Sequence, residues 1–81
     1  MELLDTVQLM LSNDREDNLK AEYWQTKIRY AKLKAMRNKW DNGELDFEPI
    51  CSRDMYRAQS LAMYDYLRIL KHIAEIEGIE L

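Results

Sequence analysis

The sequence predicts an all-α protein: an antiparallel helical hairpin of two long helices, preceded by a short N-terminal helix. Two observations predict this fold. Only two glycines and one proline occur in 81 residues, so few positions interrupt a helix. Residues of high helix propensity fill two long segments, and their apolar residues recur at the three- and four-residue spacing of an amphipathic helix. Because a chain of this length rarely holds more than one domain, we expect residues 1–81 to form a single helical domain.

The first half of the chain is expected to form a short helix over about residues 2–11 and a long helix over about residues 15–40. Polar residues separate the two helices. Asn13 and Glu16 have the spacing of a capping box at the start of the long helix. The short helix is indicated by apolar residues at helical spacing, namely Leu4, Val7 and Met10 or Leu11.

The second half is expected to form a loop over residues 41–51 and a long helix over about residues 53–77. The sequence Asp-Asn-Gly at the start of the loop supplies a helix stop and a turn. Ser52 is the expected N-cap of the last helix, and Gly78 is expected to end it. The loop contains apolar residues that we expect to pack against the helices: Leu45, Phe47, Pro49 and Ile50.

The long helices carry more apolar surface than one hairpin contact can bury. At 100° per residue, the apolar arc of the last helix is about 180° wide, whereas one neighbouring helix covers about 100°. The central helix has a heptad-like stripe that alternates small and large residues. We therefore expect a homo-oligomer, the alternative being a compact three-helix monomer whose short helix and loop cover the surplus. The residues expected at the core or the oligomer interface are Ala21, Trp24, Ile28, Ala31, Ala35, Tyr66, Ile69 and Ile73.

Charge is distributed unevenly along the chain. Residues 15–40 hold eight cations and three carboxylates, residues 41–50 hold four carboxylates and no cation, and the formal net charge of the chain is −3. An acidic chain is not expected to bind bulk nucleic acid. The longest uncharged run is the eight residues 6–13, far short of the about 20 needed to span a membrane. With a single cysteine and no export signal, the sequence favours a cytoplasmic protein.

The candidate binding site is a strip on the central helix in which aromatic and cationic residues alternate. Steps of three and four residues place them on one face. Rings flanked by cations suit a small anionic nucleotide or an acidic protein patch. The alternative is that the tyrosines border the hairpin core while the cations extend into water. The strip consists of Tyr23, Lys27, Tyr30, Lys34 and Arg37.

Catalytic and metal sites find little support in the sequence. Cys51 and His72 are the only soft metal ligands and lie 21 positions apart, so no metal site is expected. The acidic loop lacks the spacing of an EF-hand and its closing glutamate. No glycine-rich phosphate loop and no paired nucleophile and base can be identified. We therefore expect no enzymatic activity and no cofactor.

The last third of the chain contains a glutamine, Gln59, followed by the pair Ala62 and Met63 and by Tyr66. In this pattern it resembles short helical-hairpin proteins encoded by crAss-like and other tailed phages. Those proteins have a long helix, a variable loop and a second helix with a Gln, an Ala-Met pair and a Tyr. The resemblance covers roughly residues 19–77 and implies a helical hairpin of phage origin. The matching positions are Gln59, Ala62, Met63, Tyr66, Leu67 and Leu70.

In size and hairpin form, the chain is also similar, more loosely, to phage proteins that sequester cyclic-nucleotide signals of bacterial defence. Their ligand residues do not align with this sequence, so none is transferred to it. Three hypotheses follow. The first is a phage-encoded, non-catalytic protein that occupies the surface of a host defence protein in the host cytoplasm. The second is an oligomeric protein that sequesters a cyclic-nucleotide defence signal, and the third is a small structural or assembly protein.

Overall fold

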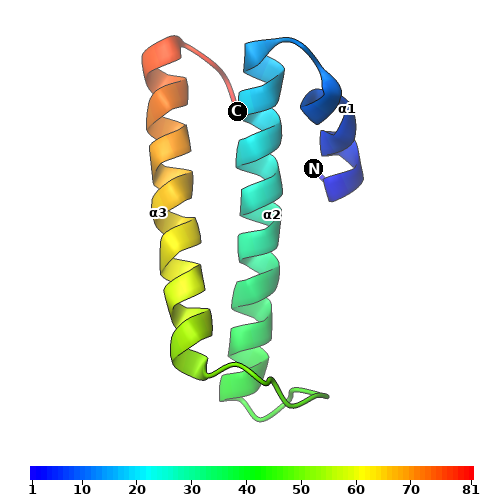
Figure 1. Cartoon of the computed structure of the whole chain (residues 1–81), viewed down its shortest axis with the longest axis vertical. Helices are drawn as coiled ribbons and strands as arrows, with labels where there is room; N and C mark the ends of the chain where they lie inside the picture. The colour runs from blue at the N-terminus through cyan, green and yellow to red at the C-terminus, as the bar shows by residue number, and fades with distance from the viewer.

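The computed structural model describes all 81 residues, and helices are its only regular structure. A short 3₁₀ helix, η1 (Leu3–Asp5), leads into α1 (Thr6–Leu11), and two long helices follow, α2 (Arg15–Asp41) and α3 (Arg53–Glu77). Helices α2 and α3 run antiparallel, and α1 lies on the side of α2 that faces away from α3 (Figure 1). The predicted all-α hairpin with a short N-terminal helix is confirmed. None of the helices combines the length and the apolarity needed to cross a membrane.

Side-chain contacts between α2 and α3 follow one another along the hairpin in antiparallel order. At the loop end, the rings of Trp40 and Tyr56 lie 6.0 Å apart, and nearer the middle Tyr30 and Tyr64 lie 6.3 Å apart. Further along, the Tyr66 hydroxyl donates to a carboxylate oxygen of Glu22 at 3.0 Å. At the open end, an ion pair of 3.0 Å joins Arg15 to Glu77. These contacts fix the register of the two helices.

Capping side chains explain where the long helices begin. The Ser52 hydroxyl accepts a hydrogen bond from the Met55 backbone N–H at 3.3 Å, as predicted. At α2 the predicted capping box of Asn13 and Glu16 is wrong by one residue. Asp14 is the N-cap, and its carboxylate accepts the Glu16 backbone N–H at 3.0 Å. A carboxylate also interacts favourably with the positive end of the helix dipole, which the neutral Asn13 side chain cannot do.

Both long helices end in a Schellman motif centred on a glycine with positive φ. At the end of α2, Gly43 has φ 70°, and the backbone N–H of the following Glu44 donates to the Lys39 carbonyl at 2.8 Å. At the end of α3, Gly78 has φ 69°, and the backbone N–H of Ile79 donates to the Ala74 carbonyl at 2.8 Å. After Gly78 the chain turns back toward α2 (Figure 1).

The hairpin core is thin. Only six of 81 residues are buried, so most of the apolar surface is covered in part or not at all. On α3 the buried positions are Ser60, Leu70 and Ala74, and the Ser60 hydroxyl has no hydrogen-bond partner. On α2 they are Ala21 and Tyr23. The interior of the hairpin therefore holds one large aliphatic side chain, Leu70, and one aromatic ring.

The residues expected at the core or oligomer interface separate into two groups. Ala21 is buried, and Trp24, Ile28 and Ile73 are partly buried. The others are exposed in the single chain, although the Tyr66 hydroxyl contacts Glu22 of α2. As an interface between chains they stay a prediction. The exposed group consists of Ala31, Ala35, Tyr66 and Ile69.

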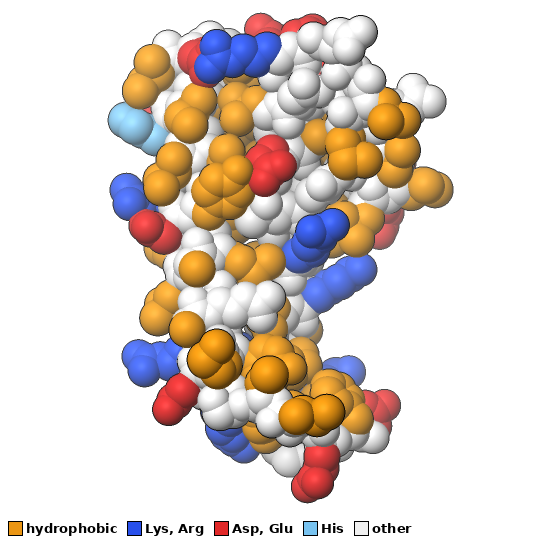
Figure 2. Space-filling model, viewed as in Figure 1, with side chains coloured by type: hydrophobic (Ala, Val, Ile, Leu, Met, Phe, Trp, Pro, Cys, Tyr) orange, Lys and Arg blue, Asp and Glu red, His pale blue; other side chains and the backbone are white.

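The short helix and the loop do not cover this surface. Helix α1 contacts α2 through the buried Thr6, whose hydroxyl accepts a hydrogen bond from the Gln25 amide at 3.0 Å, and α1 does not reach α3. Leu4 of η1 and the α1 residues Val7, Met10 and Leu11 are exposed. In the loop, Leu45 and Pro49 are partly buried, but the expected packing of Phe47 and Ile50 is wrong, since both are exposed. Figure 2 shows hydrophobic side chains gathered along α3 and over the loop.

Candidate functional site

A groove of about 300 Å³ lies between α2 and α3 on one face of the hairpin. This volume is at the lower end of the range typical of small-molecule sites, about 300–1,000 Å³. Both helices contribute aromatic and cationic side chains to it, and no carboxylate lines it. The lining residues are Tyr23, Lys27, Tyr30, Tyr64, Leu67, Arg68 and Lys71.

Aromatic rings form the walls of the groove. Tyr30 and Tyr64 face each other across the two helices with their ring planes at 50°. Tyr64 is largely exposed, so one face of its ring is free for stacking. Tyr23 is buried and meets Trp24 edge-on at 5.4 Å, which holds the Tyr23 ring in place. The groove thus has a rigid aromatic base at one end and an accessible ring at the other.

Three cations surround these rings. The Lys27 ammonium lies 5.5 Å from the centroid of the Tyr23 ring and 5.0 Å from that of Trp24, and it forms no ion pair. Lys71 also lacks an ion-pair partner. Arg68 is bound to Asp65 at 2.8 Å, and this hydrogen bond, with the carboxylate charge, raises the pKa of Arg68. The two free ammonium groups are therefore the groups best able to bind an anion.

A second hollow of about 380 Å³ extends the groove toward the open end of the hairpin. It shares Tyr23, Lys27 and Lys71 with the first and adds Trp24 and Ala74. The C-terminal segment reaches this place, since Ile79 and Leu81 also line it. Glu75 is the one carboxylate side chain there. The two hollows adjoin through these shared residues, and the first contains cations without a carboxylate, whereas the second also contains Glu75.

The structure places three of the five residues of the predicted strip in the groove. Tyr23, Lys27 and Tyr30 line the groove, whereas Lys34 does not, its ammonium lying 5.6 Å from the Tyr30 ring centroid. Arg37 lies toward the loop end, where it lines a separate hollow of about 130 Å³. There Arg53 stacks on Trp40 at 4.8 Å and pairs with Asp41 at 2.9 Å.

The half of the groove supplied by α3 was missing from the sequence prediction. Tyr64, Arg68 and Lys71 follow one another at steps of four and three residues, which is a helical-face signal of the same kind as the strip on α2. Arg68 and Lys71 lie on the charged side of α3, which the sequence pattern alone places away from the apolar arc. Only the rotation of α3 about its axis, set by Leu70 and Ala74 packing toward α2, brings that side to the groove.

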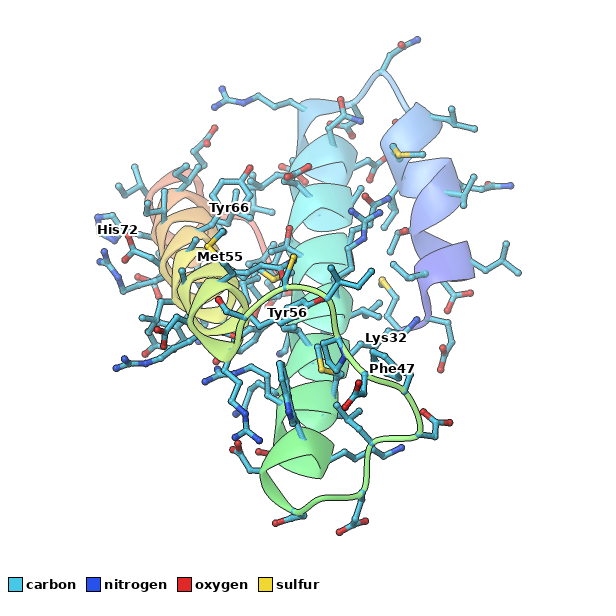
Figure 3. The ribbon with its side chains drawn as sticks, turned by 60° about the horizontal axis from the view of Figure 1, so that its bottom comes forward. Lys32, Phe47, Met55, Tyr56, Tyr66 and His72 are labelled. Carbon is cyan, nitrogen blue, oxygen red and sulfur yellow. The ribbon has the colours of Figure 1, made fainter.

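Residues with catalytic or metal-binding chemistry lie elsewhere and apart from one another. His72 is largely exposed and faces away from α2, whereas Tyr66 lies on the side of α3 toward α2 (Figure 3). The His72 Nδ1 atom is 4.0 Å from a Glu75 oxygen, and Cys51 is exposed near the loop. No three His, Cys, Asp or Glu side chains come together as metal ligands would. The chemistry that the groove offers is ring stacking and charge neutralisation.

Comparison with known proteins adds one finding. The family model described as Sequestin matches residues 13–72, which include all of α2, the loop and most of α3. The name suggests a protein that sequesters a binding partner and not one that transforms a substrate. No curated protein and no solved structure is significantly similar to the chain. The match covers well over half of the sequence and both walls of the groove, and the chain therefore belongs to the Sequestin family.

Proposed function

We propose that this protein sequesters a small phosphorylated ligand with a planar base, and that the groove between α2 and α3 holds it without changing it chemically. The observation that carries the proposal is the lining of the first hollow, in which tyrosines lie beside unpaired lysines and no carboxylate is present. The Sequestin family supports a sequestering function. A cyclic-nucleotide defence signal has the required chemistry, and its removal would suit a phage-encoded protein acting in the host cytoplasm.

The tyrosines would bind the base of the ligand, and the lysines would bind its phosphate. Stacking of a base on the exposed Tyr64 ring, beside Tyr30, contributes about 1–3 kcal/mol by analogy with other base–aromatic contacts. Hydrogen bonds from the Lys27 and Lys71 ammonium groups to phosphate oxygens contribute about 1.5–3 kcal/mol each. Because Lys27 now interacts with the faces of Tyr23 and Trp24, binding would exchange a cation–π contact for an ion pair.

A thermal-shift screen against cyclic di- and trinucleotides tests this function. A ligand at a hundred times its dissociation constant adds about 2.7 kcal/mol to the free energy of unfolding. The double variant Lys27→Gln/Lys71→Gln should bind the best ligand at least about a hundredfold more weakly, since it removes two charged contacts. The matched control is Lys32→Gln/Lys39→Gln, which removes the same charge from α2 outside the groove and should change affinity little.

Two outcomes would count against the proposal. One is the absence of any shift across the nucleotide panel, and the other is an equal loss of affinity in the control variant, which would indicate general charge attraction. The bound molecule should also be recovered intact after the protein is denatured, as measured by chromatography. Recovery of a cleaved product would replace sequestration with catalysis.

Occupation of a host defence protein's surface is the second candidate function. The observation that favours it is the exposed apolar surface of α3, where Met55 and Ile76 are 63% and 72% exposed. A pull-down from host lysate tests it, because a specific partner should be lost when Ile76 is replaced by Glu and kept when groove lysines are replaced. Recovery of the protein alone would remove this candidate and leave a structural or assembly role beside sequestration.

We also propose that the protein is a homo-oligomer. Thirteen large apolar residues are exposed in the single chain, and several of them lie together on α3, where a contiguous apolar patch is typical of an interaction surface. The molar mass measured by light scattering over a range of concentrations tests this point independently of any ligand.

A further inference from the structure

One face of α3 carries apolar residues from the start of the helix to its end, and the rest of the chain leaves most of this face exposed. The middle of this face points about 130° away from the direction in which Ser60, Leu70 and Ala74 are buried against α2, at 100° per residue. Ile69 and Ile76 are 43% and 72% exposed, and Ile73 is partly buried. Tyr66 borders this face on the side toward α2, where its hydroxyl donates to Glu22. In sequence order, the face consists of Met55, Ala58, Ala62, Ile69, Ile73 and Ile76.

The spacing of these residues is symmetric. The intervals between them are three, four, seven, four and three positions, so the series is the same in both directions along the helix. The sizes of these side chains are also complementary when the helix is paired with an antiparallel copy of itself. When α3 is laid antiparallel on a copy of itself about a point between residues 65 and 66, Ala58 lies opposite Ile73 and Ala62 lies opposite Ile69. At the ends, Met55 lies opposite Ile76.

We propose that α3 is the dimer interface of this protein and pairs with α3 of a second copy in this antiparallel register. A two-fold interface requires a surface complementary to itself, and each alanine here provides the space that an isoleucine of the other copy fills. The charges near the axis agree with this arrangement. Asp65 is already paired with Arg68 at 2.8 Å, so the two copies bring together two acid–base pairs and not two bare carboxylates.

The register also defines where the ligand grooves lie in the dimer. Tyr64 and Lys71 line the groove on another side of α3, and neither belongs to the apolar face. Each copy would therefore keep its own groove open after pairing. The inference does not depend on the proposed ligand, because it follows from the apolar face of α3 alone.

Light scattering combined with a charge substitution tests the location of the interface. The wild type should have twice the 9.8 kDa mass of the single chain, and Ile69→Glu should raise the dimer dissociation constant at least about a hundredfold, because each copy then buries a carboxylate opposite Ala62. Leu4→Glu is the matched control, since Leu4 is equally apolar and 80% exposed but lies on η1. Far-UV circular dichroism should show that both variants stay helical.

A wild type that stays monomeric at millimolar concentration would overturn the proposal, whether or not it binds nucleotides. So would an oligomer that Ile69→Glu leaves intact, since the interface would then lie elsewhere. A monomer that captures a host protein through this face would assign the face to a different occupant.

Disulfide cross-linking in a Cys51→Ser background tests the register without destabilising the fold. In the antiparallel register the two copies of residue 62 lie seven positions apart, about 10 Å along the helix axis, which exceeds the about 4.4–6.8 Å between α-carbons of a disulfide. Ala62→Cys and Ile69→Cys should therefore each stay uncross-linked alone, whereas the double variant should form covalent dimers. Efficient cross-linking of either single variant would indicate a parallel pair and refute the register.

Discussion

Replacement of Leu70 by alanine tests the packing of the hairpin most directly. Leu70 is the only large aliphatic residue that is buried between α2 and α3, with 4% of its surface exposed. Its neighbour Ile69 is 43% exposed and points toward the apolar face of α3. The two side chains are isomers on the same turn of α3 and differ mainly in burial. A comparison of Leu70→Ala with Ile69→Ala therefore measures the effect of burial on the free energy of unfolding.

The expected magnitudes follow from these exposures. Removing a buried leucine side chain costs about 2–5 kcal/mol, because transfer free energy and the cavity left behind both contribute. A chain of 81 residues has a total stability of about 4–12 kcal/mol at typical values per residue. Leu70→Ala should therefore remove a large part of the stability. Ile69→Ala in the monomer should cost less than about 1 kcal/mol, since most of that side chain already meets water and alanine favours the helix.

Urea unfolding followed by far-UV circular dichroism measures both free energies. The measurement is made at a low micromolar concentration and repeated at a concentration a hundred times higher. If α3 forms a dimer interface, the cost of Ile69→Ala should grow with concentration, because the substitution then also weakens association, whereas the cost of Leu70→Ala at low concentration reports the hairpin alone. Equal costs for the two variants at low concentration, or a larger cost for Ile69→Ala, would refute the conclusion that α3 turns Leu70 and not Ile69 toward α2.

Three further substitutions have defined outcomes. Ser60→Ala should stabilise the protein by about 1 kcal/mol in thermal unfolding, because it removes a buried hydroxyl without a hydrogen-bond partner; a loss of stability would indicate an unseen partner. Gly78→Ala should cost about 1–2 kcal/mol, because φ there is 69°, and an unchanged melting temperature would contradict this. Burial, and then the hydrogen bond to Glu22, raise the pKa of Tyr66 above 10.0. The folded state thus holds this proton more tightly, and its contribution to stability is lost as pH rises past about 10. Urea unfolding at several alkaline pH values should show a smaller loss for Tyr66→Phe than for the wild type; equal losses would exclude Tyr66 as the cause.

Local structure could be predicted from the sequence because its causes are local. Both long helices follow from helix propensity, from the scarcity of glycine and proline, and from the periodic apolar residues. Ser52 begins α3 and Gly78 ends it, through hydrogen bonds that span only three to five residues. The one capping error, Asn13 for Asp14, arose because two adjacent polar residues can both serve as an N-cap.

Only the α2 side of the candidate site could be predicted from the sequence, because only that side depends on local spacing. Tyr23, Lys27 and Tyr30 lie on one helix, so their common face follows from spacing alone. Tyr64, Arg68 and Lys71 belong to the other helix, and their approach to the same groove depends on how α3 is rotated. The apolar arc of α3 is so wide that several rotations bury similar areas, and the pattern cannot distinguish among them.

The sequence by itself determined that this protein is an all-α hairpin, where its helices start and stop, and that it carries more apolar surface than two helices need. Only the tertiary structure decided which part of that surface is buried. Leu70 and Ala74 of α3 pack toward α2, while the face with Ile69 and Ile76 remains exposed. The physical reason is that helix formation depends on neighbours along the chain, whereas the choice of packing face depends on side-chain fit between residues more than forty positions apart, such as Glu22 and Tyr66.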